Sequence, residues 1–199
     1  MNVLELFSGT RSIGKVCDQL GWTSVSVDLL LPADHKCDIM DFDYKQYYST
    51  LKDCNLGRKV RGEIYTKEIR EKEMKEDDKL VLKTLEIFNY FNPFYWFIEN
   101  PATSRIKDRI FMKGIQNYVV DYCMFSNWGY KKRTRIFTNK KDFVPLLCNK
   151  DCGNIKNGKH ILTCDNGYDK RGVDKYNKGT KKLERYRIPE DLILSLFLD

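Results

Sequence analysis

The stretch from Asn2 to Asp28 reads NVLELFSGTRSIGKVCDQLGWTSVSVD, which has the pattern of a strand, a glycine loop, a helix, a second strand and an acid. A short apolar run ends at Ser8-Gly9, and such a run is typical of a buried strand in a parallel sheet. Apolar residues then recur at helical spacing up to Gly21, where a glycine commonly ends a helix. Thr23 to Val27 supply the second strand. The stretch therefore predicts one βαβ unit of a doubly wound, mostly parallel α/β sheet.

The glycine loop of this unit indicates a ligand-binding site. The helix is expected to begin inside the loop, so that its free backbone N–H groups face the crevice at the carboxyl end of the first strand. Asp28 follows the second strand, where a carboxylate can accept hydrogen bonds from both hydroxyls of a ribose. The sequence therefore predicts an adenosine-type ligand.

Three other interpretations of the loop compete with this one. Gly9 to Val16 fits the GxxxxGK pattern of a P-loop, but Val16 stands where Ser or Thr must hold Mg²⁺, which disfavours ATP hydrolysis. The dinucleotide fingerprint GxGxxG also fails, because only Gly9 and Gly14 are present in the loop. The third alternative is a strand–helix junction whose glycines serve packing alone.

Three motifs carry a resemblance to a known family. LELFSGTRSIGKVCDQLGW followed by VSVD resembles motif I and the acidic position of the cytosine-5 DNA methyltransferases, especially their small phage-type and virus-type members. FIENP at Phe97 to Pro101 and KKRTRIFTN at Lys131 to Asn139 resemble motifs VI and VIII, in the same order. The resemblance implies a Rossmann-like methyltransferase that uses S-adenosylmethionine as cofactor and DNA as partner.

The resemblance also implies a cofactor site. Phe7, Ser8 and Gly9 would line it, and Asp28 would bind the ribose. Asp38 matches the acid at the end of the third strand that contacts the adenine amino group in the family, with Asp41 as a weaker candidate. The alternative for both is a turn carboxylate, since Asp is favoured in turns.

The same family assigns catalytic roles to residues of motifs VI and VIII. Glu99 follows a dense apolar run, and its counterpart hydrogen-bonds N3 and the amino group of cytosine. Arg135 matches the arginine that contacts O2 of the base, with Arg133 in support, and Lys131 stands where the family usually has Gln. If this segment is a strand, Arg133 and Arg135 project to one face. The alternative is a basic edge strand that resists aggregation.

The chain departs from the family where the catalytic thiol should lie. A Pro-Cys loop normally follows the fourth strand, but the residues between Asp43 and Ser49 are too few for a strand and that loop. We interpret this as a deletion, which would leave a gap between the first and fifth strands of the family's sheet. If Gln46 to Leu51 served as the missing strand, Cys54 would fall near the position of the nucleophile. The alternatives are a catalytically inactive relative that binds S-adenosylmethionine and DNA, and an RNA-directed methyltransferase.

Composition limits the class of protein. The 199 residues, 42% of them hydrophobic, suit a single domain that spans the chain. No apolar run is long enough to cross a membrane and no signal peptide is recognisable, so we expect a soluble, unsecreted, cytoplasmic protein in a prokaryotic, phage or viral setting. The 7 cysteines are an odd number, which favours reduced thiols or metal ligands over a disulfide framework.

The formal charge of +7 is unevenly distributed. Residues 140–187 hold 13 Lys or Arg against 6 Asp or Glu, together with Tyr168, Tyr176 and Tyr186. Basic and aromatic side chains in one segment suit phosphate contact and base stacking, so nucleic acid is the predicted partner. The alternative is a solvated basic surface without a ligand. The segment takes the place of the family's target-recognition domain but is short, so we expect limited sequence specificity.

Cys148, Cys152, His160 and Cys164 form the remaining constellation, with the spacing Cys-x3-Cys-x7-His-x3-Cys. Four soft ligands in such a short stretch could hold a structural zinc ion. Because neither gap is the common CxxC spacing, free cysteines are the alternative.

Other elements are predicted from periodicity or from the resemblance. Residues 55–79 are expected to form a charged loop, Asp77 to Phe91 a helix, Asp121 to Phe125 a strand, and Glu190 to Leu198 a short amphipathic helix.

Overall fold

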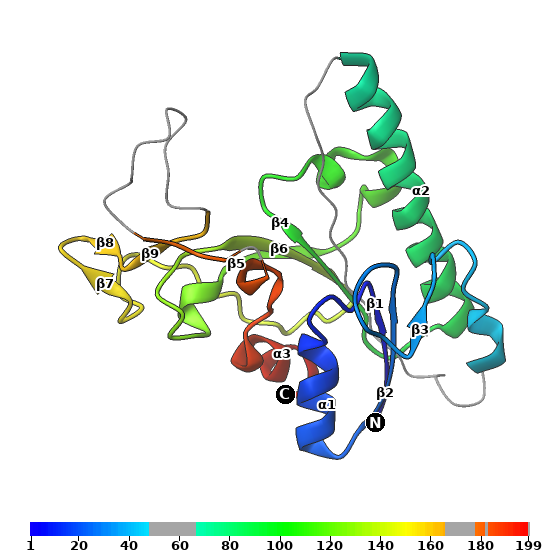
Figure 1. Cartoon of the computed structure of the whole chain (residues 1–199), viewed down its shortest axis with the longest axis horizontal. Coiled ribbons are helices and arrows are strands. Elements are labelled where there is room, and N and C mark those ends of the chain that lie inside the picture. Colours follow the sequence, from blue (N-terminus) through cyan, green and yellow to red (C-terminus); the bar gives the residue numbers. More distant parts are fainter. Residues whose placement is uncertain (48–66, 166–177, 182, 199) are drawn as a thin grey trace.

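The computed structural model describes residues 1–47, 67–165, 178–181 and 183–198 of the chain (Figure 1). Cys54, Tyr168 and Tyr176, which carry sequence-based predictions, lie outside the described residues. Two three-stranded sheets form the middle layer of the protein, and helices cover both faces of this layer.

The predicted βαβ unit is present at the N-terminus. Strand β1 (Asn2–Leu6), helix α1 (Ser12–Leu20) and strand β2 (Thr23–Asp28) follow one another, and β1 pairs with β2 in parallel. Gly21 ends α1 with a left-handed φ of 67°, a conformation that glycine adopts without strain. A short strand, β3 (His35–Lys36), extends the parallel sheet on the other side of β2.

The second sheet is antiparallel. It has the order β4-β6-β5, with β4 at Phe97–Pro101, β5 at Asn117–Asp121 and β6 at Arg133–Thr138. The central position of β6 shows that the edge-strand interpretation of this basic segment was wrong. The expectation of a strand at Asp121 to Phe125 was also wrong, because the strand ends at Asp121 and residues Tyr122–Met124 form a 3₁₀ turn, η4. This turn is closed by a hydrogen bond from the Phe125 N–H to the Tyr122 carbonyl, which directs the chain away from the sheet.

The two sheets are separate among the described residues. Strand β1 pairs with β2 alone and β4 pairs with β6 alone, so one edge of each strand has no described partner strand. Among the described residues no strand lies between β1 and β4, and residues 48–66, where the sequence predicts the deletion, lie outside the described residues. Side chains from both sheets nevertheless pack into shared cores, which hold the two sheets together across the gap.

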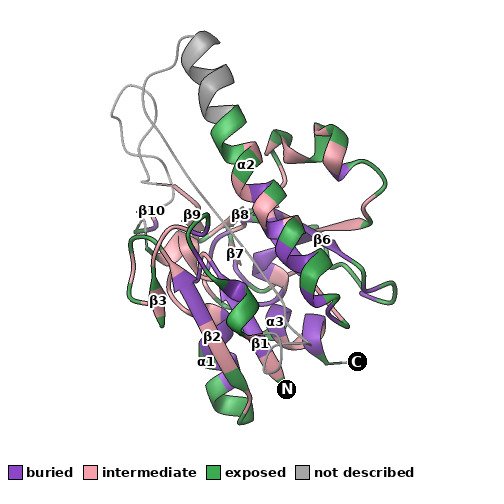
Figure 2. Cartoon of the chain, turned by 90° about the vertical axis from the view of Figure 1, so that its right-hand side faces the viewer, coloured by how far each residue is buried: buried purple, intermediate pink, exposed green. Residues whose placement is uncertain are grey.

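Helices lie on opposite faces of the sheets. Helix α2 (Lys67–Phe91) contributes Val81, Ile87 and Phe88 to a core with strand residues of one face, and helices α1 and α3 (Glu190–Phe197) cover the other face. Figure 2 shows the buried inner sides of these elements. The prediction of α3 is confirmed.

Helix α2 begins ten residues before the predicted Asp77, so the expectation of a loop over this part of residues 55–79 was wrong. The extra turns are rich in Lys and Glu, which are good helix formers and need no apolar face to be helical.

The remaining elements are short. They are four two-residue strands, β7 (Ile155–Lys156), β8 (Lys159–His160), β9 (Leu162–Thr163) and β10 (Lys178–Gly179), and further 3₁₀ turns η1 (Tyr44–Tyr47), η2 (Arg105–Asp108), η3 (Ile110–Met112) and η5 (Glu184–Tyr186). In the part of the chain that the structure describes, no helix is both long enough and apolar enough to span a bilayer.

Candidate functional site

The glycine loop between β1 and α1 is tied to the end of β2. The Ser8 N–H donates to the Val27 carbonyl at 3.0 Å, and the Gly9 N–H donates to Oδ2 of Asp28 at 2.9 Å. Phe7 and Gly9 both have a φ of 54°, and for Phe7 this left-handed conformation is strained. The loop is thus held in a specific, partly strained shape at the edge of the parallel sheet.

Asp28 organises this edge through both carboxylate oxygens. Besides the Gly9 N–H on Oδ2, the N–H groups of Leu30 and Leu31 donate to Oδ1, each at 2.8 Å. A carboxylate has about four acceptor positions, so the contacts leave about one for a ligand hydroxyl. Asp28 is therefore primarily a structural acceptor for the loop, with limited capacity for the ribose contact that the sequence predicts.

Glu5, which sequence analysis did not select, occupies the N-terminus of α1. Its carboxylate accepts hydrogen bonds from the N–H groups of Ile13 at 3.2 Å and Gly14 at 2.9 Å. The expectation that these helix amides would face a ligand was therefore wrong, since an internal acid already occupies them. The sequence does contain a signal for this role, because Glu5 is an acid within the apolar run VLELF. An acid in a buried strand needs hydrogen-bond or charge partners.

Burial raises the pKa of Glu5 to about 7 from 4.5, although the two N–H donors oppose the rise. Because the folded pKa lies above the unfolded one, the stabilising contribution is fully present below pH 4.5 and is lost as the pH rises through 7. We expect wild type to lose about 3 kcal/mol of unfolding free energy relative to Glu5→Gln between these limits. Urea denaturation of both proteins at pH 4.5, 6 and 8 checks this. Parallel pH profiles would contradict it.

The remaining predicted cofactor residues lie at the same edge. Oγ of Ser8 is buried and has no hydrogen-bond partner among the described residues, so a polar ligand group there would satisfy it. Asp38, just after β3, accepts a hydrogen bond from the Met40 N–H at 2.9 Å, as a turn aspartate does. The orphaned hydroxyl of Ser8 and the acids after β2 and β3 fit an adenosine-type group with polar substituents.

Glu99 on β4 lies at the centre of a buried polar network. Its Oε1 accepts hydrogen bonds from Tyr122 Oη at 2.9 Å, Lys132 Nζ at 3.1 Å and Thr134 Oγ1 at 2.8 Å. Lys132 Nζ also lies 4.4 Å from the centroid of the Tyr122 ring. No described residue donates to the second carboxylate oxygen, Oε2, so one oxygen is fixed while the other can accept a hydrogen bond from a ligand.

This network sets the charge of Glu99. Burial alone would raise the pKa of Glu99, but the Lys132 charge and the hydrogen bonds from Thr134, Lys132 and Tyr122 together hold it below its usual value. The group is therefore a carboxylate at neutral pH. Tyr122 is correspondingly held protonated, because burial and the neighbouring Glu99 charge raise the pKa of this phenol well above its usual value.

Replacing Lys132 by Met is expected to destabilise the protein by about 3–5 kcal/mol, because the variant buries the Glu99 charge without its cation. Lys132 is 8% exposed, so water cannot compensate for the loss. The matched control is Lys79→Met, whose partner Glu76 is 2.8 Å away on the exposed side of α2, and which should cost at most about 1 kcal/mol. Urea denaturation measures both, and equal losses would contradict a charged buried pair.

The structure places the two predicted arginines on the sheet face opposite Glu99. Glu99 lies on the α1 and α3 face with Thr134, whereas Arg133 and Arg135 alternate with Thr134 along β6 and point to the other face. Arg135 Nη1 donates to Oδ1 of Asn117, and its buried Nε has no hydrogen-bond partner among the described residues. The side chains that the resemblance assigns to one base are thus not brought together.

Asp121, a second residue that sequence analysis missed, anchors the start of β6. It is fully buried and accepts a bidentate pair of hydrogen bonds from Arg133, at 2.8 and 2.7 Å. Lys131 Nζ lies 3.0 Å from the same carboxylate, and the Cys148 N–H donates to it at 2.9 Å. Arg133 therefore forms an internal ion pair with Asp121.

The predicted Cys/His constellation is only partly assembled. Cys148, Cys152 and His160 come together, but the fourth member is Cys123 rather than Cys164, and the donor atoms of this set lie within 4.8 Å of one another. Cys123 belongs to the turn after β5, so its proximity depends on the fold and not on sequence spacing. We call this set the Cys/His cluster, and it could hold a metal ion.

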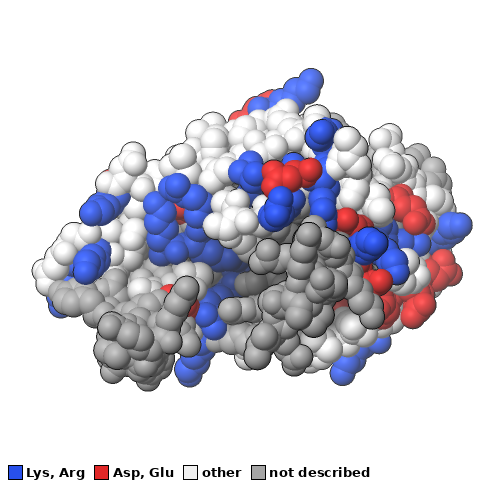
Figure 3. All heavy atoms as spheres, turned by 90° about the horizontal axis from the view of Figure 1, so that it is seen from above, with Lys and Arg blue, Asp and Glu red and all other residues white. Residues whose placement is uncertain are grey.

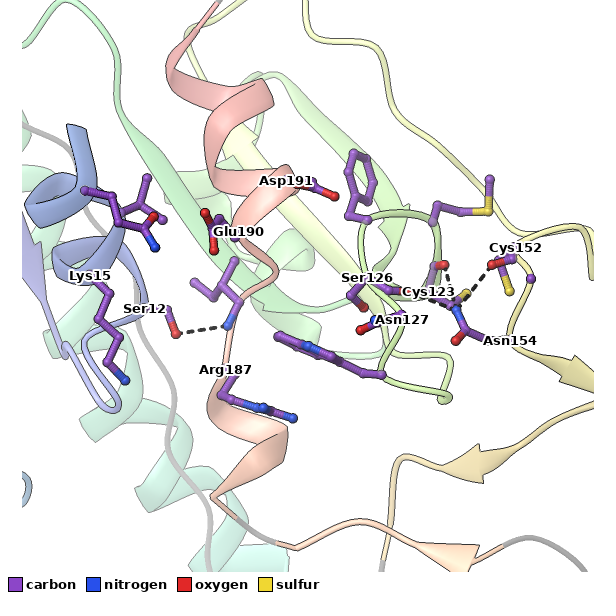
Figure 4. Close-up of a pocket in the computed structure, with 17 residues that line it drawn as sticks. Ser12, Lys15, Cys123, Ser126, Asn127, Cys152, Asn154, Arg187, Glu190 and Asp191 are labelled. Atoms are coloured by element: carbon purple, nitrogen blue, oxygen red, sulfur yellow. Dashed lines mark hydrogen bonds between the residues drawn. The ribbon is translucent and has the colours of Figure 1, made fainter.

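A cavity of about 870 Å³ opens beside this cluster (Figure 4). It lies between α1, the turn after β5 and the start of α3, and its lining includes Lys15, Trp128, Arg187 and Asp191. The Arg187 guanidinium stacks on Trp128 at 4.3 Å from the ring centroid. None of the predicted cofactor residues or Glu99 lines this cavity, so it is separate from the loop edge described above.

The α/β architecture, the glycine loop after β1 and the acids at the end of β2 and after β3 define a Rossmann-like protein with a nucleoside-type site. No protein-family model matches the chain. A protein of Frog virus 3 (isolate Goorha) named "Probable DNA (cytosine-5)-methyltransferase" is 34% identical, and the match covers 98% of each chain. The chain therefore belongs to the DNA (cytosine-5)-methyltransferase family. The alignment extends over 222 positions, more than the 199 residues of this chain, so it includes positions that this chain lacks.

One solved structure supports the fold. A "putative DNA modification methyltransferase" encoded within an Escherichia coli prophage matches with a TM-score of 0.50 and 15% identity, over 90% of this chain and 62% of that one. The Dnmt2 methyltransferase of S. pombe matches with a TM-score of 0.47 and 16% identity, over 73% of this chain and 52% of that one. The chain thus spans little more than half the length of the solved structures that it matches.

Proposed function

We propose that this chain transfers a methyl group from S-adenosylmethionine to C5 of cytosine in DNA. The observation that carries the proposal is the state of Glu99: a buried carboxylate with Oε1 fixed by three donors and Oε2 without a described donor. Such a group is preorganised to hold a polar base edge, because its orientation and its charge are set before the base arrives.

The role proposed for Glu99 follows from the chemistry of cytosine. Attack of a thiolate on C6 makes C5 nucleophilic, and negative charge then develops on the ring near N3. A proton taken up by N3 from solvent neutralises that charge, and a carboxylate that accepts hydrogen bonds from N3–H and the exocyclic amino group stabilises the protonated ring. The Lys132 cation keeps Glu99 ionised for this task, and Tyr122 and Thr134 keep it from rotating.

The cofactor site proposed here is the loop edge formed by Phe7, Ser8, Gly9, Asp28 and Asp38. When bound, S-adenosylmethionine supplies the methyl group as an electrophilic sulfonium. The Ser8 hydroxyl, which has no described partner, and the remaining acceptor position of Asp28 would bind polar groups of the nucleoside. Asp38 would accept a hydrogen bond from the adenine amino group through Oδ2, to which no described residue donates.

The surface proposed to contact DNA is formed by the basic segment at residues 140–187. Figure 3 shows Lys and Arg side chains gathered on one part of the molecule, whereas most acidic side chains lie on another part of this face. Within residues 140–187, the described basic residues that are exposed are Lys141, Lys150, Lys156, Lys159 and Lys181. Lys140 is an exception, since it is buried and donates to the Leu196 and Leu198 carbonyls at the end of α3.

The nucleophile proposed for this reaction is Cys54. It lies outside the described residues, in the connection between η1 and α2 where the family's fourth strand and Pro-Cys loop would fall. Five of the other six cysteines are poor candidates: burial raises the pKa of Cys17 to about 11, burial also raises that of Cys37, and three belong to the Cys/His cluster.

A second candidate function is binding of S-adenosylmethionine and DNA without catalysis. The gap between β1 and β4 favours this alternative, because in the family the strand that fills this position leads into the nucleophile loop. This second candidate predicts the same affinities for S-adenosylmethionine and DNA as the first, but no methylated DNA.

The experiment that tests the proposal is transfer of radiolabelled methyl from S-adenosylmethionine to duplex DNA, single-stranded DNA and RNA of the same sequence. The expected result is 5-methylcytosine in DNA, identified by nucleoside mass spectrometry. Parallel calorimetric titration with S-adenosylmethionine shows whether the cofactor binds. Binding without transfer would support the second candidate, label in RNA alone would overturn the choice of DNA, and neither binding nor transfer would overturn both functions.

A further inference from the structure

The Cys/His cluster joins three segments of the chain. Cys123 lies in the turn after β5, Cys148 and Cys152 lie in the segment that leads to β7, and His160 ends β8. Cys123 and Cys148 are buried, at 2% and 5% exposure. Three thiols and an imidazole thus converge at one point of the interior.

The spacing of the donor atoms is that of a tetrahedral zinc site. Nε2 of His160 lies 3.5 Å from Sγ of Cys148 and 3.5 Å from Sγ of Cys152. With Zn–S bonds of about 2.3 Å and Zn–N bonds of about 2.0 Å, two ligands of a tetrahedron are about 3.5 Å apart. The sulfur of Cys123 lies within 4.8 Å of the other donor atoms and completes the set.

The surroundings support the ligands. The Lys150 N–H donates to Sγ of Cys148 at 3.3 Å, which favours a thiolate. The buried side chain of Asn154 donates to the carbonyls of Cys123 at 3.2 Å and Cys152 at 3.3 Å, so one amide holds two ligand segments (Figure 4). Such outer contacts orient the ligands of a metal site.

Charge compensation is also present. Zn²⁺ with three thiolates and a neutral imidazole carries a net charge of −1, after the three thiol protons are released to solvent. The Lys131 ammonium donates to the Cys148 carbonyl at 3.1 Å and lies beside the cluster. A cation at this position offsets the negative charge of the complex.

We propose that Cys123, Cys148, Cys152 and His160 bind one structural zinc ion, which fastens residues 148–160 to the end of β5. Four protein ligands fill the coordination sphere of the zinc ion, as in structural zinc sites, whereas catalytic zinc sites leave one position open. The attachment reaches the second sheet directly, because Cys148 also donates its N–H to the buried Asp121 that anchors Arg133.

Metal analysis of the purified full chain tests the proposal. The expected result is one zinc per chain by plasma mass spectrometry, and one cobalt per chain after exchange, with a thiolate-to-cobalt absorption band of the intensity of three thiolates. Wild type that contains no zinc and takes up no cobalt would overturn the proposal. A disulfide between any two of the three cysteines in protein purified without reductant would also overturn it.

The ligand set is tested by two matched substitutions. Cys123→Ser should weaken zinc binding by more than about 100-fold, since removal of even an outer contact of a metal site costs 10–100-fold. Cys164→Ser, which alters the cysteine that sequence spacing favours, should keep one zinc per chain and the full cobalt band. Loss of metal from Cys164→Ser with retention by Cys123→Ser would overturn the ligand assignment. If Cys123→Ser fails to fold, the Cys164→Ser result and the wild-type cobalt spectrum still decide the matter.

Discussion

The Cys54→Ser variant is expected to lose methyl transfer to cytosine by about 10⁴-fold or more, because the proposed reaction requires a thiolate at C6 of the base. The hydroxyl of serine is almost entirely protonated at neutral pH, so it cannot replace a thiolate. Calorimetric titration should show unchanged binding of S-adenosylmethionine, because none of the proposed cofactor residues is altered.

Covalent trapping of the protein on modified DNA is a second test of this prediction. DNA that contains 5-fluorocytosine cannot lose a proton from C5 after methyl transfer, so the wild type should remain covalently attached to it under denaturing conditions. The Cys54→Ser protein should form no such complex. The control is Cys37→Ser, which makes the same change at a partly buried thiol packed against the core and should keep both rate and trapping. An unchanged rate in Cys54→Ser would remove Cys54 as the nucleophile.

The Glu99→Gln variant is expected to lower the rate constant of methyl transfer by about 10²–10⁴-fold, the range typical for loss of a group that assists proton transfer. Glutamine keeps the shape of the side chain and can still accept from Thr134, but it removes the negative charge that pairs with Lys132. Its amide group would also meet the cytosine amino group donor to donor. Binding of S-adenosylmethionine should stay within a few fold of wild type.

A control for Glu99→Gln exists on the surface of α2. Glu86 also accepts hydrogen bonds from a tyrosine and a lysine, Tyr44 at 2.6 Å and Lys83 at 2.8 Å, but its side chain is about half exposed. Glu86→Gln should therefore leave the rate unchanged. Single-turnover kinetics separates the rate constant from DNA affinity, and circular dichroism checks the fold. Equal rates for Glu99→Gln and wild type would show that Glu99 serves stability alone.

Local signals made the N-terminal unit predictable. The apolar run before Ser8, the helical spacing and the glycine at the end of α1 all depend on neighbours within a few residues, so the sequence predicted β1, α1 and β2 correctly. The start of α2 was missed for the opposite reason. Its first turns contain few apolar residues, so a pattern based on burial could not predict them, whereas the high helix propensity of Lys and Glu is compatible with a helix there.

Residues with distant partners were harder to predict. Glu5 is recognisable as an acid in an apolar strand, but its hydrogen-bond donors, the Ile13 and Gly14 N–H groups, reach it only when α1 packs on β1. Asp121 was expected to begin a strand, whereas it ends one and holds Arg133. In both cases the chemistry depends on a contact between elements, which residue spacing does not encode.

The sequence by itself determined the βαβ unit, the family motifs and the shortage of residues where the fourth strand should lie, because each is a property of consecutive residues. The tertiary structure alone decided that Glu99 and Arg135 face opposite sides of a sheet, and that Cys123 replaces Cys164 beside His160. The physical reason is that strand register sets the direction of every side chain, and that packing of β5 against residues 148–160 sets which thiols meet.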